Sequence, residues 1–270
     1  MISIRRYSIK NPYLLPYVKW IWHCESSEAN IYYKLLPTDC IDIIMNLSKE
    51  MFYETDSTNI LAAPVHINGL RSKYSYIRQE TPFHIWGISF YYFGLYPFIH
   101  QSLESIRDKI VDLYDLSYPL AGKLEHAVTR DNKNERIRRN IEDTLYEELK
   151  IKNVYTEKLR MIWDFFSTNN NTTVQEFCLK NQIRNKTFTR NVLSYTGYTP
   201  KALYAIMRFQ KAGNQLIYQE KNKFSQMEYL NSFSDQSHFI REFKRFSGVS
   251  PSVFIKERIT VKENAQYFYE

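Results

Sequence analysis

The sequence Ser-Asp-Gln-Ser-His-Phe-Ile-Arg-Glu-Phe-Lys-Arg-Phe-Ser-Gly-Val-Ser-Pro occupies residues 234–251, and part of it repeats an earlier stretch in fixed register. Phe188-Thr-Arg190 precedes Gly197-Tyr-Thr-Pro200 as Phe239-Ile-Arg241 precedes Gly248-Val-Ser-Pro251, and each counterpart lies 51 positions later. A repeated helix that carries an outward arginine and ends at a glycine predicts two copies of one DNA-reading unit.

The first copy shows the start and stop signals of two helices. Thr173-Val-Gln-Glu176 has the capping-box form, in which the threonine and glutamate side chains satisfy free amides at a helix start. We expect a short helix over 174–180, a turn over 181–183 and a second helix over 184–195. The inward side chains of the second helix are Phe188, Val192 and Tyr195. This plan is a helix-turn-helix, whose second helix enters the major groove of DNA.

The second copy follows the same plan. A short helix is expected over 224–231, a turn at 232–233, an N-cap at Ser234 and a longer helix over 235–247. The longer helix is expected to bury Phe239, Phe243 and Phe246.

The residues between the two copies predict one long helix over 200–218, about 25–30 Å long at 1.5 Å per residue. That length approaches the ~34 Å that separates successive major grooves on one side of a duplex. Two reading helices on such a spacer can engage adjacent grooves, with some bending of the DNA.

Residues 234–251 resemble the signature of the AraC family of bacterial transcription regulators, and the first copy is similar to the family's more variable first half. The resemblance covers about residues 155–260 and implies two helix-turn-helix units joined by a long helix. By matching position, it places the base-facing side chains at Lys186, Thr189, Arg190, Gln236, Ser237, Ile240 and Arg241. We add three neighbours to the predicted DNA-binding set: Arg184, Asp235 and Lys244.

Three positions depart from the family pattern: Glu228 replaces a small residue, and Ser232 and Gln182 each replace a glycine. The two repeated arginines also have a purely structural interpretation. Arg190 and Arg241 could form salt bridges within the chain, with a neighbour such as Glu242, rather than contact DNA.

Charge and composition agree with a DNA-binding second half. The net charge of the 270 residues is +7, of which residues 1–150 carry −1 and residues 151–270 carry +8. A basic domain favours polyanions, because neutralised phosphates release counterions. Three widely spaced cysteines indicate reduced thiols in the cytoplasm, and no secretion signal is expected at the start. The apolar run over 83–100 predicts a buried strand and a turn rather than a membrane helix.

The first half predicts an α+β organisation. Strands are expected over 38–47 and 85–93, and helices from about residue 97. Ile99, Leu103, Ile106 and Ile110 fall at helical spacing. We therefore predict a β-rich front domain with trailing helices over 1–152, an all-α DNA-binding domain over 153–262 and a tail over 263–270.

The front half is also similar to the poorly characterised sensor-like domain of some AraC-family regulators. The similarity rests on Leu14-Leu-Pro-Tyr-Val18 with nearby tryptophans, on Leu36-Pro-Thr-Asp-Cys-Ile-Asp-Ile-Ile44 and on Gly87-Ile-Ser-Phe90. In the family pattern an Asp and a Gly stand where Thr38 and Asp39 are found here. This resemblance supplies no ligand.

Candidate ligand-binding residues in the front half are Trp20, Trp22, His66, Arg71 and Trp86, although aromatic side chains in a β-domain more often form core. The histidines lack the usual metal-ligand spacings, so no metal site is predicted, and no cofactor is expected. Asp39 and Asp42 lie three apart on a strand and point to opposite faces, which does not suit a catalytic pair. An enzyme would need an activated cysteine or a nucleotide-binding motif, and none is evident; no catalytic residue is predicted.

The sequence thus predicts a cytoplasmic, sequence-specific transcription regulator that binds double-stranded promoter DNA. A small molecule or partner bound to the front domain is the expected control, with RNA polymerase and a second copy of the chain as further candidate partners. The alternative is a protein-interaction or dimerisation module that is tethered to DNA and takes no small-molecule effector.

Overall fold

The computed structural model of the protein describes residues 3–27, 31–48, 50–55, 57–79, 82–152, 157–167, 172–218, 233 and 235–256. Several predictions concern residues outside these ranges. They are the short helix over 224–231, Glu228, Ser232, the start of the second predicted domain at 153 and the tail over 263–270.

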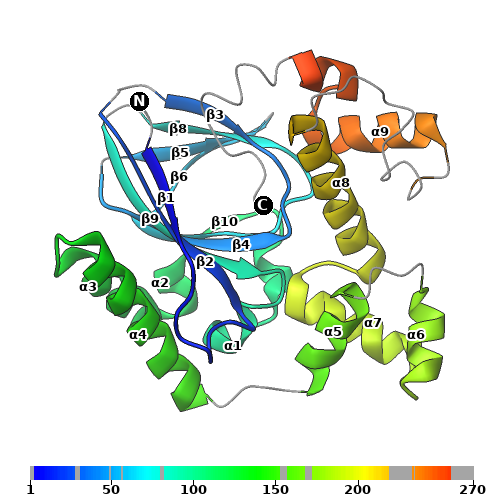
Figure 1. Cartoon of the computed structure of the whole chain (residues 1–270), viewed down its shortest axis with the longest axis horizontal. Coiled ribbons are helices and arrows are strands. Elements are labelled where there is room, and N and C mark those ends of the chain that lie inside the picture. Colours follow the sequence, from blue (N-terminus) through cyan, green and yellow to red (C-terminus); the bar gives the residue numbers. More distant parts are fainter. Residues whose placement is uncertain are drawn as a thin grey trace.

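Two antiparallel sheets form the described front half (Figure 1). The larger sheet has the strand order β1-β2-β9-β4-β7-β10, and the smaller has the order β3-β8-β5-β6. The strands of the larger sheet are β1 Ser3–Tyr7, β2 Val18–Ser26, β4 Cys40–Asn46, β7 Val65–Asn68, β9 Phe83–Tyr91 and β10 Ile110–Asp112. Those of the smaller sheet are β3 Ile31–Leu35, β5 Met51–Glu54, β6 Asn59–Leu61 and β8 Ser75–Gln79. Both predicted strands are therefore confirmed, as β4 and β9.

Strand β4 shows why the two sheets pack face to face. Successive side chains alternate between the faces of a strand. Ile41 and Ile43 belong to the main hydrophobic core, whereas Ile44 joins Met51 and Tyr53 of the smaller sheet in a second buried cluster. The space between the sheets, hereafter the inter-sheet space, is thus a separate core.

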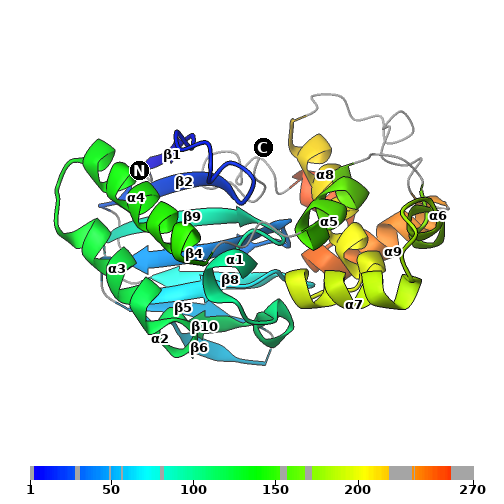
Figure 2. The same cartoon turned by 90° about the horizontal axis from the view of Figure 1, so that it is seen from below.

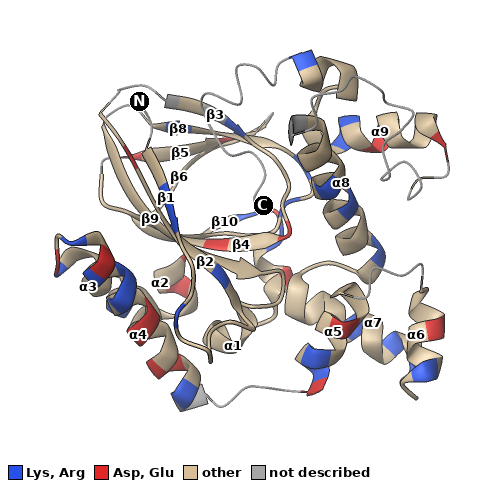
Figure 3. Ribbon diagram, viewed as in Figure 1, with Lys and Arg blue, Asp and Glu red and all other residues tan. Residues whose placement is uncertain are grey.

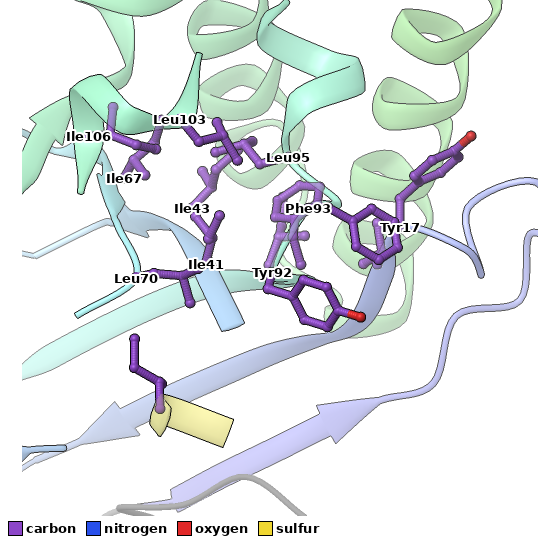
Figure 4. Close-up of a cluster of buried hydrophobic side chains, with 14 of the residues drawn as sticks. Tyr17, Ile41, Ile43, Ile67, Leu70, Tyr92, Phe93, Leu95, Leu103 and Ile106 are labelled. Carbon is purple, nitrogen blue, oxygen red and sulfur yellow. The ribbon is translucent and has the colours of Figure 1, made fainter. Parts of the chain in front are cut away.

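Helices cover the opposite face of the larger sheet, and their apolar side chains complete the main core (Figure 2). These elements are α1 Tyr96–Ile99, η1 Leu103–Ile106, α2 Leu113–Leu116, α3 Tyr118–Thr129 and α4 Asn134–Lys152. Figure 4 shows part of this core, where Leu95, Leu103 and Ile106 lie against Ile43 and Ile67 of the sheet.

The predicted continuous helix through Ile99, Leu103, Ile106 and Ile110 is wrong. The backbone leaves the helix at His100, which has φ = 54°, and turns again at Asp108, which has φ = 57°. Ile110 instead begins β10, which pairs with β7. The first three apolar residues are buried as predicted, but a short helix and a 3-10 turn bury them, because pairing with the sheet edge fixes the following backbone.

The second half is helical in the described ranges, so the predicted α+β class is confirmed. Its elements are α5 Glu157–Ser167, α6 Val174–Lys180, α7 Asn185–Thr196, α8 Pro200–Tyr218 and α9 Gln236–Ser247, and residues 251–256 are also helical. The long spacer helix is thus confirmed as α8. No helix in the described ranges is long and apolar enough to cross a membrane.

The two halves share one hydrophobic core. The main cluster runs without a break from Tyr7 in β1 to Phe254 behind α9. Helix α5 packs its Trp163 edge-on against Tyr91, with ring centroids 5.3 Å apart, and Phe166 against Tyr92 at the same distance. The helices that carry the repeat are therefore packed on the front domain through side chains of the core.

Candidate nucleic-acid interface

Helix α6 begins with the predicted capping box. The Thr173 hydroxyl accepts a hydrogen bond from the Glu176 amide at 3.2 Å, and the Glu176 carboxylate accepts one from the Thr173 amide at 2.7 Å. The hydrogen bonds from Thr173 lower the pKa of Glu176, because they favour the charged carboxylate. The turn to α7 passes through Gln182, whose φ of 55° lies in the left-handed region.

Helix α7 presents its predicted face to solvent. Phe188, Val192 and Tyr195 are buried, as expected. Lys186 and Arg190 are exposed, Thr189 is half-buried, and Arg184 stands exposed at the N-cap position. The first reading helix therefore offers cationic side chains on the side opposite its packed phenylalanine.

Helix α9 repeats this arrangement. Phe239, Phe243 and Phe246 are buried, whereas the predicted contact residues are exposed: Asp235, Gln236, Ser237, Ile240, Arg241 and Lys244. The N-cap is Asp235, whose carboxylate accepts a hydrogen bond from the His238 amide at 2.7 Å, so the prediction of Ser234 as N-cap is wrong. Serine and aspartate are equally good caps, and the start of the helix one residue later selects the aspartate.

The repeated arginines are not used in salt bridges among the described residues. Glu242, the acid considered as their alternative partner, pairs instead with Arg208 of α8 and with Arg245, the latter at 3.4 Å. The Arg208 guanidinium also lies 4.2 Å from the centre of the Phe233 ring. Arg208 thereby ties α9 to the spacer helix and leaves Arg190 and Arg241 directed to solvent.

Helix α8 separates the two reading helices. Its 19 residues correspond to about 28 Å, close to the ~34 Å spacing of successive major grooves. In Figure 1, α7 lies near one end of α8 and α9 near the other. Figure 3 marks lysine and arginine positions in blue on the ribbons of both reading helices and along α8, in agreement with the positive charge of this half.

Both reading helices end against the front domain. Gly197 and Gly248 are the left-handed C-caps, with φ of 81° and 80°. A Cβ added at Gly197 would lie 2.8 Å from the Leu103 carbonyl, and one at Gly248 would lie 2.4 Å from the Tyr74 ring. The two register-matched glycines are thus required by their backbone conformation and by their contacts with the front domain.

Further contacts hold this arrangement. The Tyr198 hydroxyl donates a hydrogen bond to the Leu70 carbonyl at 3.1 Å, and the Asp39 amide donates one to the Gln210 side chain at 2.8 Å. The Tyr195 ring stacks on Tyr96 at a centroid distance of 4.0 Å.

The structure brings together some of the predicted ligand-binding residues and separates others. Trp22 and His66 face the inter-sheet space, and Arg71 joins them there through its interactions with Tyr53. Trp20 lies near the edge, where the Arg6 guanidinium covers its ring at 4.8 Å. Trp86 points to the other face of the larger sheet and stacks on Tyr7 in the main core, so it cannot share a site with Trp22.

Polar groups that the sequence prediction omitted complete the inter-sheet space. The Ser89 hydroxyl accepts from the Trp22 indole at 3.1 Å and donates to the Asp42 carboxylate. Burial is the main reason that the pKa of Asp42 is raised to about 6. Asp42 could have been found from the sequence, because alternation along β4 places it on the same face as Ile44.

His66 is held as a neutral imidazole in this space. Its Nδ1 donates to the Ala63 carbonyl at 2.7 Å, so Nε2 accepts from the Tyr53 hydroxyl at 2.9 Å. Burial lowers the pKa of His66 to about 4. The Arg71 guanidinium donates to Asn68 at 2.6 Å and to Ser75, while its Nη2 atom has no hydrogen-bond partner among the described residues.

The three thiols do not provide an activated nucleophile. Burial raises the pKa of Cys24 to about 12, and it also raises the pKa of Cys40 and of Cys178. These groups are therefore protonated near neutral pH, whereas thiol chemistry requires the thiolate.

Comparison with known families gives two matches, one in each half of the chain. A family model described as a helix-turn-helix domain matches residues 178–257, a range that includes both reading helices. A second model, described as a domain of unknown function (DUF6597), matches residues 11–112. No curated protein matches the chain at a significant level.

The fold and the matched helix-turn-helix domain define a DNA-binding transcription regulator with a β-rich front half. More narrowly, its helix-turn-helix domain is of the AraC type.

Solved structures with a similar course of the chain include ToxT from Vibrio cholerae, at 12% identity and a TM-score of 0.45, covering 94% of this chain and 98% of that chain. A ToxT structure bound to (E)-4-(8-methylnaphthalen-1-yl)but-3-enoic acid has 10% identity and a TM-score of 0.46, with coverage of 95% and 99%. The AraC-like transcriptional activator CuxR has 15% identity and a TM-score of 0.34, with coverage of 79% and 87%.

Proposed function

We propose that this chain recognises a specific promoter sequence by placing α7 and α9 in two successive major grooves of one duplex. The observation that carries this proposal is the exposure of Arg190 and Arg241 in matched register, while the phenylalanines beside them are buried. The spacer length of about 28 Å supports adjacent grooves, and the shortfall from ~34 Å favours bent DNA.

The exposed side chains divide into two chemical groups. Arg190 and Arg241 suit bidentate contact with guanine, and Gln236 suits adenine. Ile240 is 38% exposed and suits a thymine methyl group, which an apolar side chain can contact. The cations Arg184, Lys186 and Lys244 suit phosphates, with Thr189 and Ser237 as neutral hydrogen-bonding neighbours. Asp235 acts mainly as the N-cap that fixes the start of α9.

The variant Arg241→Ala tests this assignment. A cognate site would first be selected from random DNA with the full chain, and affinities for that site and for random DNA would then be compared at one salt concentration. We expect a loss of roughly 1–3 kcal/mol on the cognate site and a much smaller loss on random DNA. The matched control is Arg139→Ala, which removes an exposed arginine from α4 in the front half. Equal losses on both DNAs would reduce Arg241 to a phosphate contact.

We further propose that the front domain controls DNA reading by setting where the two reading helices sit. The segment over 69–75 supports this proposal because Leu70 accepts the hydrogen bond from Tyr198, Tyr74 adjoins Gly248, and Arg71 reaches the inter-sheet space. A small molecule in that space would act on the same segment that touches both units. Native mass spectrometry of the purified chain tests for such an occupant. Sedimentation at micromolar concentration tests the alternative, a dimer formed through the front half.

A further inference from the structure

Three metal-ligating side chains gather on one face of the paired strands β2 and β9: His23, Glu25 and His84. His23 and Glu25 are two residues apart on β2 and therefore point to the same side. In the antiparallel register His84 pairs with Glu25, and Trp86 pairs with His23. One donor atom from each of the three residues can be chosen so that all lie within 4.8 Å of one another. This face is opposite to the one that lines the inter-sheet space.

The buried member of the group is His23, which is only 4% exposed. Its ring stacks on Trp86 at a centroid distance of 4.7 Å and meets the His84 ring edge-on at 4.8 Å. The Nε2 atom of His23 has no hydrogen-bond partner within the described part of the chain. The nearest acid is Glu25, whose Oε2 is 3.9 Å away and thus beyond hydrogen-bond distance. Buried ring nitrogens ordinarily have a partner, so this atom is available to a metal ion or to a hydrogen-bonding group.

We propose that His23, Glu25 and His84 bind one divalent metal ion of the Zn²⁺ type. Two imidazoles and a carboxylate are ligands that Zn²⁺ accepts, and three protein ligands leave a fourth position for water or another small ligand. Bonds of about 2.0–2.2 Å place tetrahedral ligand atoms roughly 3.3–3.5 Å apart, so the donor atoms must approach one another on binding. The exposed Glu25 side chain, on the rim of the group, can make that movement without disturbing the core.

Charged groups on both sides of the site act on a bound cation. Arg5 pairs with His23 from β1, and its positive charge opposes a bound cation. The Glu25 carboxylate offsets that charge. We therefore expect the loss of Glu25 to weaken metal binding more than the loss of another ligand.

The metal prediction from sequence missed this group for a physical reason. That prediction looked for ligand spacings within one segment of the chain. His23 and Glu25 supply only two metal-ligand donors in their segment. The third donor, His84, comes from a strand 59 positions later and reaches the site only through sheet pairing.

The test uses the full chain after treatment with a chelator. Co²⁺ would be titrated in and followed by its visible absorption, and Zn²⁺ would then be added as competitor. We expect one Co²⁺ per chain, displaced by Zn²⁺, with affinity at least about 10-fold weaker in Glu25→Gln and in His84→Gln. Both substitutions avoid the buried His23, and circular dichroism would confirm that the variants are folded. His126→Gln, which changes an exposed histidine on α3, is the matched control and should bind as the wild type does.

Two results would overturn the proposal. One is the absence of saturable Co²⁺ binding by the wild-type chain at millimolar metal. The other is binding that Glu25→Gln and His84→Gln leave unchanged, which would place the ion elsewhere. Neither result bears on DNA recognition, because the reading helices contribute no ligand.

Discussion

Asp42 is a carboxylate enclosed between two sheets, and it should make the stability of the protein depend on pH. Its pKa is raised to about 6, mainly by burial, whereas an unfolded chain gives it an ordinary value near 4. Between about pH 4 and 6 the folded chain therefore holds this proton more strongly than the unfolded chain does. The contribution of Asp42 is fully favourable below about pH 4 and is lost as pH rises through about 6.

We expect Asp42→Asn to remove this dependence. The free energy of unfolding of the variant, relative to the wild type, should be higher at pH 8 than at pH 4 by on the order of 2–3 kcal/mol. Urea denaturation at the two pH values measures the difference, and comparison with the wild type cancels the effects of His66 and the other buried groups. Asp143→Asn, at an exposed position on α4, is the control. A difference that is the same at both pH values would show that Asp42 titrates normally.

Among the elements, the turn between α6 and α7 carries a conformational cost at Gln182. Gln182 stands where the family resemblance implies a glycine, and its φ is 55°. A side chain in the left-handed region costs roughly 1–2 kcal/mol, and replacement by glycine removes this cost. Part of the resulting stabilisation is lost because glycine has greater freedom in the unfolded chain. We expect Gln182→Gly to raise the free energy of unfolding by about 0.5–1 kcal/mol. Gln182→Ala retains a Cβ and should bring no such gain, so equal results in chemical denaturation would contradict this reason.

Elements whose signals are local were predictable from sequence, and those fixed by distant pairing were not. The capping box at Thr173, the left-handed Gly197 and the apolar stripe of α8 are set by neighbours within a few residues, and all agree with the structure. Ile110 was assigned to a helix because its spacing allowed one, but β7, more than forty residues earlier, pairs with it as a strand. The same limit separated His84 from His23 and hid the inter-sheet contacts of Asp42 with Ser89.

At the scale of the whole molecule, the front domain and the reading helices form one packed body, and a hydrogen bond from Tyr198 is one of the contacts that join them. The Tyr198 hydroxyl donates to the Leu70 carbonyl at 3.1 Å, and both residues are buried. In Tyr198→Phe the carbonyl loses this donor but still accepts from the Asp108 amide at 3.0 Å, so the free energy of unfolding should fall by about 0.5–1.5 kcal/mol, the net worth of one hydrogen bond. The matched control is Tyr204→Phe in α8. The Tyr204 side chain is 46% exposed, so this variant should change stability little.

The same pair of variants tests whether the front domain positions the two reading helices for DNA. If it does, Tyr198→Phe should weaken binding to a selected site that engages both α7 and α9 more than binding to a fragment that retains one half-site. The reason is that the substitution loosens the unit that contains α7. This unit must be fixed relative to α9 when both helices bind one DNA, whereas binding to a single half-site does not require it. Affinities measured at one salt concentration on the two DNAs give the comparison, with Tyr204→Phe alongside. Losses of equal size on both DNAs would mean that the Tyr198 contact stabilises the fold without setting the spacing of the reading helices.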